Sequence, residues 1–141
     1  MIYQINLMVL IKSLVLNHVG LYSVSYTHLR AHETESRGFI FASALAARNN
    51  LGLVLLRKPG KLPRQTHVVQ YQLEYGFDSL EVHTDAINSS DSVFIVDDVL
   101  ATGGTMWAAT ELVKKSGGKV ANCAVFIEIS ALNGRTRLSS I

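Results

Sequence analysis

The sequence predicts an α/β domain organised around a parallel sheet. Short continuous apolar runs, typical of strands buried on both faces of such a sheet, occur at 53–56, 92–96 and 120–129. Segments with apolar residues at helical spacing occur at 39–49 and 105–116. The chain has 141 residues, of which 48% are hydrophobic, and this is enough for one domain with a sizeable core.

The two predicted helices have recognisable ends. The alanine-rich helix at 39–49 is followed by Asn50 and Gly52, and the helix at 105–116 is followed by two glycines. Glycine and asparagine readily adopt the left-handed backbone that ends a helix. Strand and helix therefore alternate along the chain, as they do in domains with a parallel sheet.

A hairpin and a loop are predicted between the first and second buried strands. Segment 57–63 contains two prolines and a glycine, so we expect a loop there. Residues 69–75 alternate between apolar and polar, as in a half-buried strand. A turn at 76–78 and a returning strand at 80–83 complete the expected hairpin.

Composition excludes several classes of protein. A net charge of +2 is too weak to indicate binding to nucleic acid or to a membrane surface. The apolar run at 5–16 is too short to span a membrane, and it lacks the basic start and the cleavage site of a signal peptide. The single cysteine, Cys123, cannot form an internal disulfide, which favours a reduced, cytoplasmic location.

An anion-binding loop is predicted after the second buried strand. Asp97 and Asp98 end the strand, and a stretch of small residues leads into the next helix, namely Ala101, Thr102, Gly103, Gly104 and Thr105. Small residues let backbone N–H groups approach an anion, and the helix N-terminus adds donors and partial positive charge. Two carboxylates would repel a phosphate unless they bind another group, such as the vicinal hydroxyls of a sugar with Mg²⁺ nearby.

Neither of two common phosphate-binding motifs accounts for this loop. The sequence contains no Gly-x-x-x-x-Gly-Lys-Ser/Thr motif, and no Gly-x-Gly-x-x-Gly motif follows a strand. A simpler interpretation, an ordinary turn that caps the helix through Thr102, stays open from these residues alone.

The full pattern of strand, acid pair and Thr-Gly-Gly-Thr loop resembles the phosphoribosyl pyrophosphate (PRPP) signature of the type I phosphoribosyltransferases. Segments 35–41, 57–63 and 73–76 resemble the adenine phosphoribosyltransferases in particular, and the likeness runs from about Glu35 to Arg137. It implies a type I phosphoribosyltransferase-like parallel sheet flanked by helices, with an inserted β-hairpin and a mobile loop.

The resemblance also implies an activity. Such a pentosyltransferase acts in purine salvage: N9 of adenine displaces pyrophosphate from C1 of PRPP and AMP is formed. Its cofactor would be Mg²⁺, held mainly through PRPP and without a direct protein metal site. The enzyme would be a homodimer in the cytoplasm, with no nucleic acid or membrane partner.

Site residues follow from the same resemblance. Asp97 and Asp98 would contact the ribose hydroxyls, and the loop from Ala101 to Thr105 would hold the 5-phosphate. The implied pyrophosphate-binding residues are Glu35, Ser36, Arg37 and Gly38. The implied catalytic residues are Glu74, Arg57, Lys61 and Arg37. The implied adenine pocket consists of Ile129, Glu128 and Tyr75.

These residue types suit the chemistry, although several have a plainer interpretation. Cations such as Arg57 and Lys61 stabilise negative charge that grows on a leaving group, but charged loop residues are also often simply solvated. Glu74 could be an exposed residue on the polar face of its strand. Glu128 ends an apolar strand and would need a partner if buried, which favours a role in binding.

The first 34 residues depart from the family pattern, which enters the loop at 35–38 from a buried apolar strand. We therefore expect 1–34 to be a chimeric or artefactual segment and 35–141 to be a phosphoribosyltransferase domain truncated at both ends. Alternatively, 21–26 could supply the strand. The open alternatives for function are an inactive fragment of the enzyme, a PRPP-binding regulator, and a transferase for another purine base.

Overall fold

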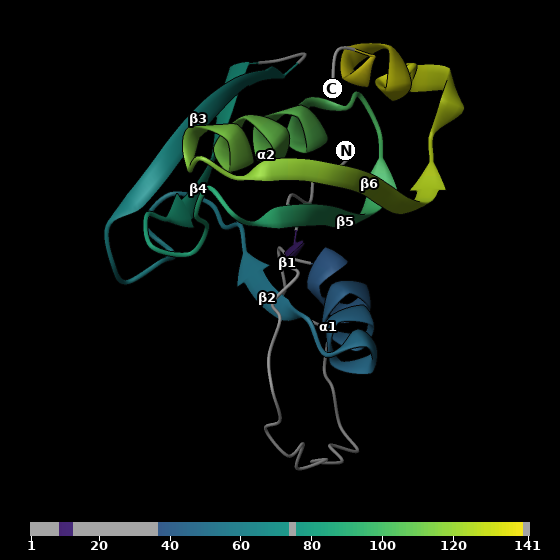
Figure 1. The fold of residues 1–141 in the computed structure, drawn as a ribbon. Helices are drawn as coiled ribbons and strands as arrows, with labels where there is room; N and C mark the ends of the chain where they lie inside the picture. Colours follow the sequence, from purple (N-terminus) through teal and green to yellow (C-terminus); the bar gives the residue numbers. More distant parts are fainter. Residues whose placement is uncertain (1–8, 13–36, 74–75, 140–141) are drawn as a thin grey trace.

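The computed structural model describes residues 9–12, 37–73 and 76–139 of the chain. The elements are β1 (Val9–Lys12), α1 (Gly38–Asn49), β2 (Gly52–Leu55), β3 (Thr66–Leu73), β4 (Gly76–His83), β5 (Ser92–Leu100), α2 (Gly104–Lys115) and β6 (Lys119–Glu128), followed by the short 3-10 helices η1 (Ser130–Leu132) and η2 (Gly134–Leu138). Figure 1 shows α1 and α2 on opposite sides of the main sheet, with the β3–β4 hairpin beside α2. The predicted α/β class, with helices flanking the sheet, is confirmed.

The main sheet has the strand order β2-β1-β5-β6. Strands β5 and β6 are parallel, as predicted, whereas β1 is antiparallel to both β2 and β5. Because β1 opposes both neighbours, β2 runs in the same direction as β5 and β6. The sequence did not predict β1, which lies between β2 and β5. The alternative strand at 21–26 lies outside the described residues.

Two apolar clusters cover the two faces of β5. Val93 and Ile95 pack with α2 and the hairpin, whereas Val96 packs with Ala42 and Ala46 of α1. Alternate residues of a strand point to opposite faces, so the sequence of β5 places one helix on each side. The strand is buried on both faces, as its continuous apolar run predicts.

The same prediction is wrong for β2 and β6. Leu53 and Leu55 of β2 are 42% and 37% exposed, and Phe126 and Ile127 of β6 are 57% and 60% exposed. Both strands lie at the ends of the described sheet, so each has a neighbouring strand along one edge only. An apolar run reports the composition of a strand, but it does not report the strand's position in the sheet.

The hairpin is confirmed, with a different turn from the one predicted. Strands β3 and β4 are antiparallel, and their register runs from the pair Thr66 and His83 to the pair Leu73 and Gly76. Residues 76–78 therefore belong to β4 and do not form the turn. Among the helices that the structure describes, none is both long and apolar enough to cross a membrane.

Candidate functional site

The predicted anion-binding loop lies at the carboxyl end of β5. The strand extends to Leu100, so it continues past Asp97 and Asp98, where the sequence predicted its end. Residues 101–103 bend, and α2 begins at Gly104 with Gly103 as its N-cap residue. No side chain caps this helix end in the described structure, so the interpretation of the loop as a Thr102 cap is wrong. The backbone N–H groups in the first turn of α2 are therefore not capped by a side chain, and they lie near the end of β5.

Close backbone packing explains both glycines of the loop. Gly103 has a φ of 79°, and a Cβ there would lie 2.5 Å from the carbonyl oxygen of Gly134. In return, a Cβ on Gly134 would lie 2.3 Å from the carbonyl oxygen of Ala101. A Cβ on Gly104 would approach the Tyr71 ring to 3.1 Å. The loop therefore packs closely between η2 and the hairpin, and the approaches at Gly103 and Gly134 leave no room for a side chain.

The two acids of β5 have different surroundings. Asp97 is 3% exposed, and burial raises its pKa to about 8, with the nearby Asp98 carboxylate adding to the rise. Its Oδ1 accepts a hydrogen bond from the backbone N–H of Asp98 at 2.9 Å. As neighbours in a strand, the two side chains point to opposite faces of the sheet. The structure therefore gives one buried carboxyl and one carboxylate that is open to partners.

Arg37 joins the predicted pyrophosphate loop to the acid pair. It is the N-cap residue of α1, and its Nε lies 3.3 Å from Oδ2 of Asp98. The Arg37 side chain is half exposed, so its other guanidinium donors can meet a ligand. Gly38, the first residue of α1, is buried. Glu35 and Ser36 lie outside the described residues.

Replacing Arg37 with alanine is expected to weaken PRPP binding about tenfold or more, because the resemblance implies that this cation faces the pyrophosphate. Arg48, exposed in the last turn of the same helix, gives the control R48A, which should bind PRPP as the wild type does. Fluorescence or calorimetric titration measures both. Equal PRPP affinity in R37A and R48A would remove Arg37 from the site.

Arg57 follows β2 at the same edge of the sheet. Val9 of β1 pairs with Leu55 of β2 on one side and with Val96 of β5 on the other. Leu55 and Val96 therefore lie at the same level of the sheet, and so do the residues that follow each of them. Nε of Arg57 is buried and has no hydrogen-bond partner among the described residues. Buried polar groups are nearly always paired, so this nitrogen is suited to meet an anionic ligand. Lys61, farther along the loop, is exposed.

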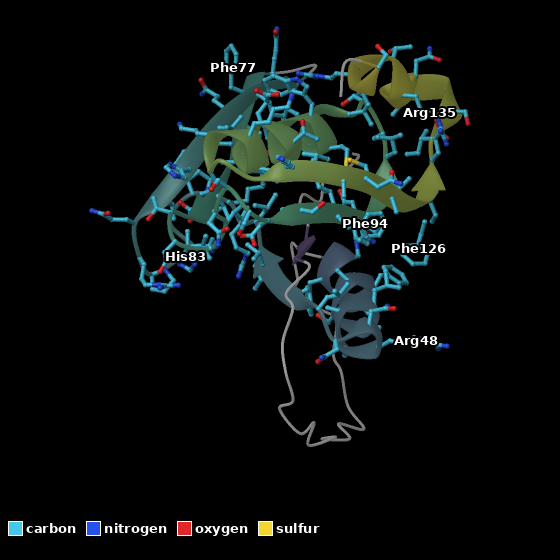
Figure 2. The ribbon with its side chains drawn as sticks, in the orientation of Figure 1. Arg48, Phe77, His83, Phe94, Phe126 and Arg135 are labelled. Carbon is cyan, nitrogen blue, oxygen red and sulfur yellow. The ribbon has the colours of Figure 1, made fainter. Side chains whose placement is uncertain are left out.

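The predicted adenine-pocket residues lie at the end of β6. The backbone N–H of Ile129 donates to the carbonyl oxygen of Leu100 at 2.9 Å, which sets Ile129 beside the loop. Glu128 has the partner that its apolar strand led us to expect, since a guanidinium nitrogen of Arg135 lies 2.7 Å from its carboxylate. Figure 2 labels Arg135, which lies near the C-terminal end of the described chain. Glu74 and Tyr75 lie outside the described residues.

Sequence reasoning missed three residues of the site. Gly134 and Tyr71 pack on the loop, and Glu81 holds segment 57–62, as described below. A lone glutamate between Leu80 and Val82 was a usable signal for Glu81, because a buried charge needs partners. Nothing in the sequence marks Tyr71 as a neighbour of the loop.

No group of three metal-ligating side chains occurs in the part of the chain that the structure describes. Mg²⁺ often binds through one or two carboxylates together with substrate phosphates. Asp97 and Asp98 point to opposite faces of β5, so at most one of them can take part in such shared binding.

Together, these features define an α/β protein in which acids, a cation and a helix N-terminus meet at the carboxyl end of a parallel strand, where such folds place their ligand sites. Residues 34–138 match the family described as the phosphoribosyl transferase domain. Since the match covers well over half of the chain, the protein belongs to this phosphoribosyltransferase family.

Adenine phosphoribosyltransferases are prominent among its similar proteins. The adenine phosphoribosyltransferase of Rubrobacter xylanophilus is 59% identical over 109 residues, which are 77% of this chain and 59% of the relative. The crystal structure of the Thermoanaerobacter pseudethanolicus adenine phosphoribosyltransferase matches with a TM-score of 0.72 and 49% identity, covering 74% of this chain and 60% of that one. The Saccharomyces cerevisiae adenine phosphoribosyltransferase, solved with an imino-altritol bisphosphate and adenine, matches with a TM-score of 0.71 and 41% identity, covering 74% and 60%. The chain thus spans about three fifths of the length of these relatives.

Proposed function

We propose that this protein is an adenine phosphoribosyltransferase, which converts adenine and PRPP into AMP and pyrophosphate. The observation that carries the proposal is the contact between Arg37 and Asp98, which joins a predicted pyrophosphate-binding segment to the predicted ribose-binding acids. The N-terminus of α2 lies beside them at the end of β5. The names of the similar proteins, and the adenine bound in the yeast structure, support adenine as the base.

The chemistry divides the site into three parts. N–H groups at the start of α2 bind the 5-phosphate, and Asp97 and Asp98 hydrogen-bond the ribose hydroxyls. Arg37, Arg57 and Lys61 stabilise the charge that grows on the departing pyrophosphate. N9 of adenine forms the new bond to C1 as the bond to pyrophosphate breaks, and the N9 proton leaves to a base, for which Glu74 is our candidate.

The proposed adenine side of the site lies at the end of β6 and on the hairpin. Ile129 would pack on the base, with Glu128 and Tyr75 beside it. Glu128 is engaged by Arg135, so its carboxylate is held in place before any ligand arrives. Mg²⁺ would bind mainly through PRPP, without a direct protein metal site, and it would supply positive charge at the pyrophosphate. The same family resemblance implies a homodimer in the cytoplasm.

Base specificity tests the proposal directly. The purified chain should form AMP from labelled adenine only when PRPP and Mg²⁺ are both present. Hypoxanthine, guanine and xanthine serve as matched competing bases. Faster turnover of one of them would identify a different purine transferase. PRPP binding without turnover would indicate a regulator, and the absence of both would indicate an inactive fragment.

The domain boundary is part of the proposal. The family match from residue 34 to residue 138 supports a phosphoribosyltransferase domain that begins near Glu35. For residues 1–34 the proposal is a chimeric or artefactual sequence that does not derive from the same gene. Strand β1 of this segment nevertheless pairs with β2 and β5. Resequencing the 5′ region of the native transcript tests this, and one continuous reading frame through codons 26–37 would overturn it.

A further inference from the structure

Glu81 is a buried carboxylate that no part of the chemistry above uses. It lies in β4 and is 4% exposed. Its Oε1 accepts hydrogen bonds from the backbone N–H groups of Lys61 and Leu62, at 3.1 and 3.0 Å. Its Oε2 accepts one from Oγ1 of Thr66 at 3.1 Å. Hydrogen bonds to an ionised acceptor are stronger than neutral ones, so this carboxylate is a firm anchor for the loop backbone.

The backbone of the same residue holds the other end of the loop. The N–H of Arg57 donates to the carbonyl oxygen of Glu81 at 3.0 Å, and the N–H of Glu81 donates to the carbonyl oxygen of Arg57 at 2.7 Å. These bonds form an isolated antiparallel bridge. One residue of β4 therefore contacts both Arg57 and Lys61, two of the three cations that the proposed reaction needs.

Between these contacts, one backbone hydrogen bond also shapes the loop, from the N–H of Lys61 to the carbonyl oxygen of Lys58 at 3.2 Å. Pro59 and Gly60 are exposed, and a Cβ on Gly60 would meet no atom within 4 Å. A second contact comes from Lys58, whose Nζ lies 2.6 Å from Oδ2 of Asp78 on the same hairpin strand. That contact holds a side chain, whereas Glu81 holds the backbone that carries Lys61.

We propose that Glu81 is a positioning residue, whose carboxylate fixes the backbone of Lys61 and Leu62 and so presents Lys61 and Arg57 together to the leaving pyrophosphate. The catalytic consequence rests on the proposed function, but the anchoring of the loop does not. Glu81 reaches the reaction only through the loop, so it contacts no substrate itself.

Limited proteolysis with trypsin tests the anchoring without any assay of activity. Trypsin can cleave this segment after Arg57, Lys61 and Arg64, whereas Pro59 protects the bond after Lys58, and the bond after Lys61 reports on the backbone that Glu81 holds. Replacing Glu81 with alanine should speed cleavage after Lys61 about tenfold. E81Q should be cleaved nearly as slowly as the wild type, because the amide oxygen can still accept both backbone bonds.

The matched control is E111Q, which alters an exposed carboxylate paired with Lys114 on α2. It should leave the cleavage rate after Lys61 unchanged. Cleavage within α2, after Lys114 or Lys115, reports general unfolding in every variant. Wild-type cleavage after Lys61 in a folded E81A protein would overturn the anchoring.

Residue-resolved hydrogen exchange on the wild type keeps the proposal testable even if E81A does not fold. The amides of Lys61 and Leu62 should exchange at least tenfold more slowly than that of Gly60, after correction for intrinsic rates. Leu62 is the decisive position, because the N–H of Lys61 also donates to the carbonyl oxygen of Lys58. Equal protection at the three positions would contradict the two hydrogen bonds to Glu81.

Kinetics test the catalytic consequence. E81A should lower kcat at least tenfold while KM for adenine stays near the wild-type value, and E81Q should recover most of kcat. Unchanged kcat in E81A, despite a loop that trypsin cleaves rapidly, would overturn the positioning role. A wild-type protein that forms no AMP would instead overturn the proposed function, and proteolysis and exchange would still decide the anchoring.

Discussion

An Asp97→Asn protein is expected to be more stable than the wild type at pH 8 and nearly inactive in phosphoribosyl transfer. Burial raises the pKa of Asp97 from an ordinary value of 3.8 to about 8. Between these values the folded chain holds a proton that the unfolded chain has released. The free energy of unfolding therefore falls as the pH rises from 3.8 to about 8. Below pH 3.8 both states hold the proton, so Asp97 does not lower the stability there.

The size of the effect makes it measurable. From pH 5 to pH 8 the penalty grows by about 3–4 kcal/mol, and asparagine removes it because it does not titrate. Urea unfolding at both pH values gives the free energies of unfolding, and the wild type should lose more stability than Asp97→Asn. The control is Asp85→Asn, whose side chain is exposed and paired with Arg64. The account of Asp97 fails if wild type and Asp97→Asn share one pH slope.

The expected loss of activity has a separate cause. Positive charge develops on the ribose in an oxocarbenium-like transition state, and the ionised form of Asp97, which grows as the pH approaches its pKa of about 8, stabilises that charge, whereas a neutral amide does not at any pH. We expect a drop in kcat/KM of about 100-fold or more, as for other preorganised electrostatic contacts. A more stable but inactive protein would be the signature of a site residue that is retained at a cost to folding.

A Gly103→Ala protein is expected to lose most of its PRPP affinity and about 2–4 kcal/mol of stability. The new Cβ requires a left-handed backbone at φ 79° and would lie 2.5 Å from the carbonyl oxygen of Gly134. Either the loop or η2 must move, and the backbone donors at the start of α2 then leave their positions.

Gly60→Ala is the matched control for stability. Gly60 also has a φ of 79°, but a Cβ there would meet nothing within 4 Å. It should therefore cost only the backbone strain, about 1–2 kcal/mol. Thermal unfolding compares the two variants. A Gly103→Ala cost equal to that of Gly60→Ala would mean that the loop does not pack against η2 as described.

Local patterns in the sequence predicted the elements that depend on local order. The helices α1 and α2, the hairpin and the buried β5 follow from apolar spacing and from glycine or asparagine at helix ends. The positions of strands in the sheet were not predictable in this way. The runs that form β2 and β6 are as apolar as β5, yet the strand order leaves them at the ends of the described sheet.

The candidate site shows the same division. The motif at 93–105 identified Asp97, Asp98 and the loop glycines, because contiguous residues carry that chemistry. Partners from distant segments were missed, since no periodicity reports them. Glu81 holds a loop about twenty residues earlier in the chain, and Gly134 closes on a loop about thirty residues earlier. Such pairs follow from the fold and not from spacing.

Calorimetric titration of the folded wild-type chain with PRPP and Mg²⁺ tests the central claim most directly. That claim is that the end of β5 and the start of α2 form a PRPP site. The account predicts saturable binding at one site per chain, with ribose 5-phosphate competing for it. The absence of saturable heat at millimolar PRPP, from a chain whose circular dichroism shows it to be folded, would contradict the account.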